Sequence, residues 1–162
     1  ALRRVFQHIF DQKSNVNPSF VATLLPQPLR VGEALPLFGL EVTPIRLMHG
    51  RLPVAGFRID RAEGSRDGAG ASWLPLAYCT DVSGIPNETW PFLRDLSTLV
   101  LDCLRPRHHP THLNVDQAVG LASEIGARRT WFVHMAHQIR HAEVDASLPD
   151  GISLGYDGLT LE

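Results

Sequence analysis

Residues 98–104, TLVLDCL, limit the possible folds of this chain more than any other segment. Apolar residues fill the segment almost without interruption, which is typical of a strand buried on both faces of its sheet. The following residues continue the pattern. Asn114 is expected to begin a helix with Gln117 at the capping-box position, Gly126 is expected to end it, and residues 130–133 form the next strand. The second half therefore predicts alternating strands and helices in one α/β domain.

Shorter elements are expected elsewhere along the chain. Residues 2–10 have apolar positions at helical spacing, and Pro86 is expected to open a short helix. Residues 61–72 are polar and glycine-rich, so they predict an exposed loop. The final segment, ISLGYDGLTLE, predicts a tight hairpin that turns at Asp157 and Gly158. Further strands are expected where apolar residues form short runs or alternate with polar ones, at 20–25, 40–47, 54–60 and 73–79.

The composition excludes several classes of protein. The chain has 162 residues, which suits a single domain, and a formal net charge of −2, which gives no basic surface for nucleic acid. No apolar run approaches the roughly 18 residues of a membrane span, and the first residues do not resemble a signal peptide. The two cysteines, Cys79 and Cys103, have no disulfide or metal-site spacing. They predict free thiols in a reducing compartment, the cytoplasm.

Three residues of metal-ligand type stand where apolar strands are expected to end, namely His49, Asp81 and His134. Loops at strand ends are where α/β folds place their functional sites. Imidazole and carboxylate groups together suit zinc, manganese or iron. Two of these residues also have a simpler interpretation: His49 could be a turn histidine bonded to backbone, and Asp81 could form an Asx-turn or cap a helix.

A histidine cluster, HMAHQIRH, follows the strand at 130–133. If this segment were helical, the spacing of His134, His137 and His141 would place all three on one helical face. Such a face could bind a single metal ion or respond to pH at the surface.

A second cluster, RPRHHPTHLN, precedes the expected helix at Asn114. This loop could hold an anionic group near the positive end of the helix dipole. The alternative is a solvated loop in which His112 caps the helix. The basic residues are Arg105, Arg107, His108, His109 and His112.

Taken in order, five segments of the chain resemble the later motifs of metallo-β-lactamase-fold hydrolases. They are LMHGRLPVAGFRI, LAYCTDVSGIP, LVLDCLRPRHHPTHLN, HMAHQI and LGYDGLTLE. The nearest resemblance is to the phosphonate-pathway cyclic phosphodiesterases and their uncharacterised relatives. The resemblance implies a four-layer αββα sandwich of the α/β class with a two-metal site at one edge of its two sheets.

The resemblance also implies a role for each residue. His49 would bind the first metal, Asp81 would bridge both metals as well as take part in catalysis, and His134 would bind the second metal. His112 matches a histidine that meets the substrate phosphate and donates a proton without binding metal. His137 matches a position beside the metal ligands. The cofactors implied are two divalent ions, zinc or manganese with iron as a third candidate, which activate a bridging hydroxide against a phosphodiester.

The chain departs from the family pattern in one respect, because the signature His-x-His-x-Asp-His is not found in its 162 residues. That motif supplies most of the metal ligands in the family. We therefore expect residues 1–162 to be a single domain that is incomplete at its N-terminus, with weak metal binding, little hydrolysis, and an apolar face that favours self-association into a homo-oligomer. The partner expected is a small-molecule phosphodiester. The alternative function is a non-catalytic binding or interaction domain derived from the same fold.

Overall fold

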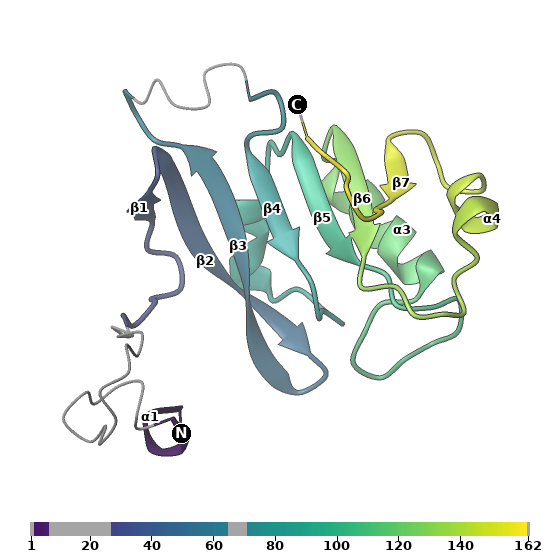
Figure 1. Ribbon diagram of the computed structural model, residues 1–162, viewed down its shortest axis with the longest axis horizontal. Coiled ribbons are helices and arrows are strands. Elements are labelled where there is room, and N and C mark those ends of the chain that lie inside the picture. The colour runs from purple at the N-terminus through teal and green to yellow at the C-terminus, as the bar shows by residue number, and fades with distance from the viewer. Residues whose placement is uncertain (1, 7–26, 65–70, 162) are drawn as a thin grey trace, which may run out of the picture.

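One mixed sheet organises the computed structural model, which describes residues 2–6, 27–64 and 71–161 (Figure 1). Its seven strands lie in sequence order. The first four are joined antiparallel, and β4 to β7 run parallel to one another. The strands are β1 (Leu35–Leu37), β2 (Leu40–His49), β3 (Leu52–Arg61), β4 (Leu76–Cys79), β5 (Thr98–Asp102), β6 (Arg129–Val133) and β7 (Ile152–Leu154).

The expected strands at 40–47, 54–60, 73–79, 98–104 and 130–133 are confirmed, with ends shifted by a few residues. The expected strand at 20–25 lies outside the described residues. Of the helix expected at 2–10, the described part is α1 (Leu2–Val5). The four-layer sandwich that the resemblance implies has two sheets. The described residues form one mixed sheet flanked by helices.

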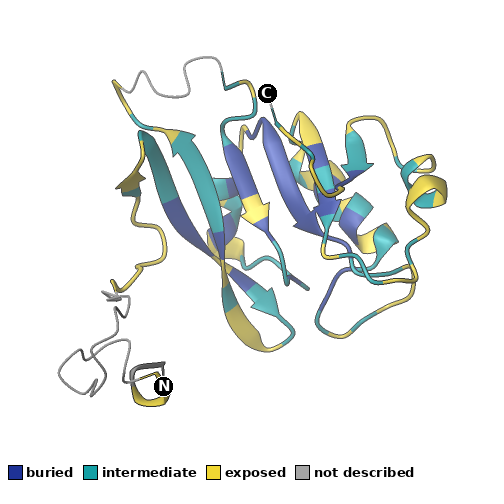
Figure 2. Cartoon of the chain, in the orientation of Figure 1, coloured by how far each residue is buried: buried dark blue, intermediate teal, exposed yellow. Residues whose placement is uncertain are grey.

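The core lies around β5, where every residue is buried. Figure 2 shows buried residues concentrated along β5 and its neighbours. On one face of the sheet, Leu99, Leu101 and Phe132 pack with Ala118 and Ala122 of helix α3 (Val115–Ile125). The near-continuous apolar run of β5 is therefore explained by cover on both of its faces.

Helix α3 begins and ends as its sequence predicts. The Asn114 side chain accepts a hydrogen bond from the Gln117 backbone N–H at 2.8 Å, and the Gln117 side chain accepts one from the Asn114 N–H at 3.1 Å. Gly126 ends the helix in the left-handed conformation, at φ 69°. The 3₁₀ helix η2 (Asn87–Leu93) follows Pro86, also as expected.

Two expectations for the last third of the chain are wrong. Residues 134–140 form no helix, and α4 (His141–Asp145) begins only at His141. The final segment is not a hairpin either. Its strand β7 pairs in parallel with β6, and the turn at 157–158 leads to residues that join no strand. The backbone N–H of Gly155 donates to Phe132 O at 2.8 Å, so this residue also bonds to β6 and not to a second strand of a hairpin.

Within the described segments, no helix has both the length and the apolar character that crossing a membrane requires.

Both thiols are expected to resist modification in the folded chain. Burial raises the pKa of Cys79 to about 12, and burial with the nearby Asp102 carboxylate raises that of Cys103 to about 12. At about pH 8 only about one thiol in ten thousand would be ionised, and the thiolate is the reactive form. Labelling with a disulfide reagent should therefore be slow in the native protein and should reach both cysteines after denaturation. Fast labelling of the native protein would show that the buried regions around Cys79 and Cys103 open readily.

Candidate metal centre

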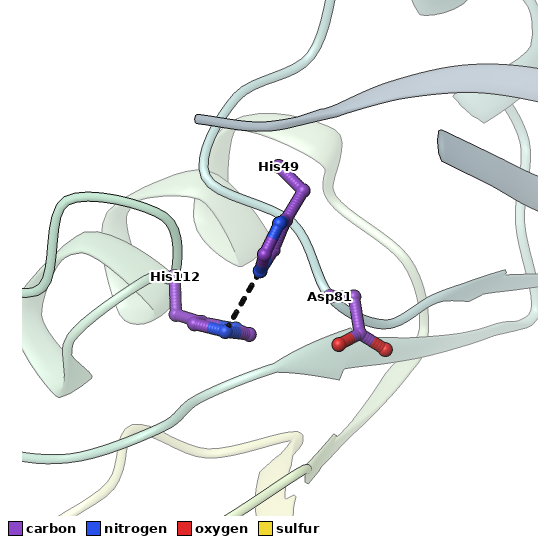
Figure 3. Close-up of side chains that lie close together, drawn as sticks. All are labelled: His49, Asp81 and His112. Carbon is purple, nitrogen blue, oxygen red and sulfur yellow. Dashed lines mark hydrogen bonds between the residues drawn. The ribbon is translucent and has the colours of Figure 1, made fainter. Parts of the chain in front are cut away.

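The predicted ligands come together at the edge of the sheet where β2, β4 and β6 end. His49 is the last residue of β2, Asp81 follows β4 by two residues, and His134 follows β6 directly. His112 reaches the same place from the loop between β5 and α3. Figure 3 shows the rings of His49 and His112 meeting, with the Asp81 side chain close beside them. Since β4, β5 and β6 are parallel in register, their carboxyl ends meet at one edge, which is where α/β sheets place sites.

The distances place these side chains within reach of shared ions. His49 Nε2 and His112 Nε2 are 3.0 Å apart, and His134 Nε2 lies 3.3 Å from Asp81 Oδ1. Ligand atoms of His49, Asp81 and His112 lie within 4.8 Å of one another, as do those of Asp102, His112 and His134. Asp81 therefore lies close to both His49 and His134.

Two of these residues have strained backbones. Asp81 has φ 54° and His134 has φ 62°, both in the left-handed region that non-glycine residues rarely adopt. Such residues cost about 1–3 kcal/mol each and persist where the surrounding structure enforces them, which is common at functional sites.

The hydrogen bonds around the loop that carries Asp81 help to hold its strained backbone in place. Backbone bonds join Met48 to Ser83 and Gly84, and Leu113 to Val82. The turn after His49 is fixed by Gly50, whose N–H donates to Ser83 Oγ at 2.8 Å. A Cβ atom on Gly50 would lie 2.9 Å from the Thr111 side chain, so the turn packs closely against the loop that carries His112.

Asp102 is the residue of the candidate site that the sequence analysis missed. Its side chain is fully buried, and its Oδ1 lies 3.2 Å from His112 Nδ1 and 3.4 Å from His134 Nδ1. Its Oδ2 accepts a hydrogen bond from the Leu113 N–H at 3.0 Å. Burial raises the pKa of the Asp102 carboxyl, while the bonds from Leu113 and His112 oppose this rise. The signal was present in the sequence, because Asp102 is the one charged residue in TLVLDCL and a buried carboxylate needs partners.

The hydrogen-bonding capacity of the two rings suits a cation. His112 can donate its Nδ1–H to Asp102, which leaves Nε2 facing His49. His134 places each ring nitrogen near a carboxylate oxygen. Imidazole nitrogens and carboxylate oxygens side by side are groups that bind zinc, manganese or iron. The donor set therefore fits divalent metal.

The structure does not bring the remaining histidines of HMAHQIRH to the site. His137 is exposed in a turn and makes no hydrogen bond or ion pair with the described residues. His141 Nε2 lies 3.2 Å from Gly155 O at the start of α4. The hypothesis of a metal site on one helical face is therefore wrong. His112 does not cap α3 either, since Asn114 has that role.

The basic loop at 105–112 lies beside the candidate site. The His109 ring centroid is 5.1 Å from that of His112, with the planes tilted at 50°. Loss of water around the ring, followed by the positive charge of Arg105 and of His112, lowers the pKa of His109. Arg105 is held by bonds from its Nε to Arg107 O at 3.3 Å and from its Nη2 to His108 O at 2.8 Å.

The sequence was compared with models of protein families and with known proteins. The model of the beta-lactamase superfamily domain matches residues 1–135. The chain is 34% identical over 122 residues to an octanoyltransferase of Porphyromonas gingivalis (strain ATCC BAA-308 / W83), a match that covers 74% of this chain and 22% of that protein.

Solved structures agree. A new diphosphatase from the PhnP family is similar at 34% identity with a TM-score of 0.78, over 99% of this chain and 53% of that one. Two others are 18% identical and show the fold alone. The metallo-beta-lactamase fold protein YhfI from Bacillus subtilis has a TM-score of 0.62 over 96% of this chain and 59% of its own. Zn(2+)-bound PqqB from Methylobacterium extorquens has a TM-score of 0.60 over 88% of this chain and 56% of its own.

The chain spans about half the length of these solved structures. The match to the superfamily domain covers most of the chain, and the similarity to the diphosphatase covers nearly all of it. These findings confirm the resemblance stated from the motifs: the chain belongs to the metallo-β-lactamase superfamily of hydrolases and is related to the PhnP family.

Proposed function

We propose that this chain carries one side of the active site of a metal-dependent phosphodiesterase. His49, Asp81 and His134 would hold divalent ions, with Asp81 as the bridge, and His112 would act on the substrate. The observation that supports this most strongly is the meeting of these four side chains from four separate segments at one edge of the sheet. The 34% identical relative, a diphosphatase, favours a phosphorus ester or anhydride over other substrates.

The mixed imidazole and carboxylate ligands suit zinc or manganese, with iron as a third candidate. When bound, two such ions lower the pKa of water and polarise a phosphoryl oxygen. His49 and His134 would each hold one of the two ions through a ring nitrogen. The half-exposed carboxylate of Asp81, with a side chain 51% exposed, would stay open to the substrate side.

His112 is proposed as the residue that protonates the leaving oxygen. The buried Asp102 accepts from its Nδ1, so the ring is held with Nε2 toward the ligands. A general acid needs a fixed ring and a nitrogen within hydrogen-bond reach of the leaving group. Asp102 therefore acts as a positioning residue, which holds His112 through one oxygen and the following Leu113 N–H through the other.

The partner proposed is a small-molecule phosphodiester, with self-association of the chain and a cytoplasmic location as further parts of the proposal. His137 follows His134 by three residues, and we propose no contact of its side chain with the metals. The non-catalytic alternative would be favoured by a chain that binds metal or phosphate and cleaves nothing.

The experiment is to load the whole chain with zinc or manganese, then measure bound metal and cleavage of bis(p-nitrophenyl) phosphate. Because the chain spans about half of its solved relatives, we expect weak binding and slow cleavage. Both should depend on His49 and Asp81, whereas His112→Ala should reduce cleavage and leave bound metal unchanged. His137→Ala is the matched control and should behave as wild type.

Two results would count against this account. If Asp81→Asn bound metal as tightly as the wild-type chain, the proposed metal site would be wrong. Nearly two tightly held equivalents of metal with fast turnover would contradict the expected weakness of the chain alone.

A further inference from the structure

We propose that Ser83 is a positioning residue that sets the distance between His49 and Asp81, two of the proposed metal ligands. The inference rests on the proposed function and deepens it, since it concerns the same site. Ser83 follows Asp81 by two residues, and its side chain is half-buried. It acts on the backbone that carries the two ligands, so this role requires no contact of Ser83 with a metal ion or with the substrate.

The Ser83 hydroxyl holds the backbone on both sides of His49. It accepts a hydrogen bond from the Gly50 N–H at 2.8 Å and donates one to Met48 O at 3.1 Å. Met48 and Gly50 are the residues directly before and after His49. A serine hydroxyl has one hydrogen to donate and lone pairs that accept, so a single side chain makes both bonds at once.

Backbone bonds join the same two segments of the chain. The Ser83 N–H donates to Met48 O at 2.7 Å, and the Met48 N–H donates to Gly84 O at 3.0 Å. The residues before and after His49 are therefore bonded to the residues that follow Asp81. Among these bonds only the two of the Ser83 hydroxyl come from a side chain, so they are the ones that a substitution can remove.

The turn at Gly50 depends on the hydroxyl of Ser83. Gly50 has a left-handed backbone with φ 62°, and a Cβ atom on it would lie 2.9 Å from the Thr111 side chain. Without the hydroxyl, the partly buried Gly50 N–H would lose its acceptor, and the backbone would move toward water or another acceptor. Such a movement displaces His49 relative to Asp81, and a metal site needs its ligands held within about 0.5 Å.

The test compares Ser83→Ala with Ser83→Thr, which keeps the hydroxyl. Each whole chain is titrated calorimetrically with zinc, and its visible absorption spectrum is recorded with cobalt(II), whose bands report the geometry of the ligands. We expect Ser83→Ala to lower zinc affinity by about tenfold, as for other residues that orient metal ligands, and to alter the cobalt spectrum. Ser83→Thr should keep the wild-type affinity and spectrum.

Ser123→Ala is the matched control. Ser123 is exposed on α3, and its hydroxyl also donates to a backbone carbonyl, Val119 O, at 2.8 Å. Its replacement removes a bond of the same kind away from the site, so zinc affinity and the cobalt spectrum should not change.

Hydrogen exchange in the wild-type chain gives a second measurement that needs no variant. The Gly50 amide should exchange slowly because it donates to Ser83, and zinc should slow the exchange further by holding His49 against the other ligands. Fast exchange at Gly50 would overturn the inference, since it would show that this bond is mostly broken in solution.

The inference would also be overturned by a Ser83→Ala chain that has wild-type zinc affinity and the wild-type cobalt spectrum. A lower melting temperature with both unchanged would give Ser83 a purely structural role. Zinc binding that depends on His49 and Asp81 but not on the Ser83 hydroxyl would refute this inference alone. Zinc binding that ignores His49 and Asp81 would refute the proposed function, and the role of Ser83 would fall with it.

Discussion

Asp102→Asn is expected to lower the affinity of the chain for zinc or manganese by about 10- to 100-fold, although Asp102 is not a proposed ligand. The carboxylate accepts from Leu113 N–H and from His112, and it faces His134 Nδ1. Asparagine keeps the shape and one acceptor oxygen, but it directs an amide N–H₂ at a ring nitrogen. Both histidine rings would then lose the orientation that turns Nε2 toward His49 and Asp81.

The measurement is calorimetric titration of metal, with thermal unfolding of the same samples to separate ligand orientation from loss of fold. Asp157→Asn serves as the control, since Asp157 is exposed in the turn near the C-terminus. Unchanged metal affinity in a folded Asp102→Asn chain would show that Asp102 does not position the ligands.

Phe132→Ala should have the largest effect on stability, about 3–5 kcal/mol lost from the free energy of unfolding. Phe132 is fully buried in β6, between strands β5 and β7, and it belongs to the central hydrophobic cluster. Removing the ring would leave a cavity that its strand neighbours cannot close, because their backbones are fixed by the sheet.

Phe38→Ala is the matched control in urea denaturation. Phe38 is 94% exposed beside β1, so its replacement should change the free energy of unfolding by no more than about 0.5 kcal/mol. Similar losses for the two variants would mean that the sheet around β5 is not the core of the fold.

Much of the sheet could be predicted from the sequence because its signals are local. The apolar run at 98–104 predicts β5, and the Asn114 and Gln117 pair predicts the start of α3, since both patterns arise within a few residues. The hairpin expected from the final segment failed for a different reason. Residues 152–154 pair with β6, which lies about twenty residues earlier in the chain, and no local pattern specifies that partner.

For the candidate site too, local sequence signals were predicted and contacts between distant segments were not. Ligand-type residues at the ends of expected strands led to His49, Asp81 and His134, and the structure brings them together. Spacing alone suggested a helical face for the last histidine cluster, but His134 has a left-handed backbone that stops any helix there. Asp102 was missed because its partners, His112 and His134, are contacts made only in the folded chain.

The most direct measurement of the central claim is anomalous scattering at the zinc absorption edge from crystals of the chain grown with excess zinc. The account predicts a peak within bonding distance of Asp81 and of His49 or His134, where four segments of the chain meet. Zinc found only at outlying groups such as His137 or His141, or no peak at saturating zinc, would contradict it.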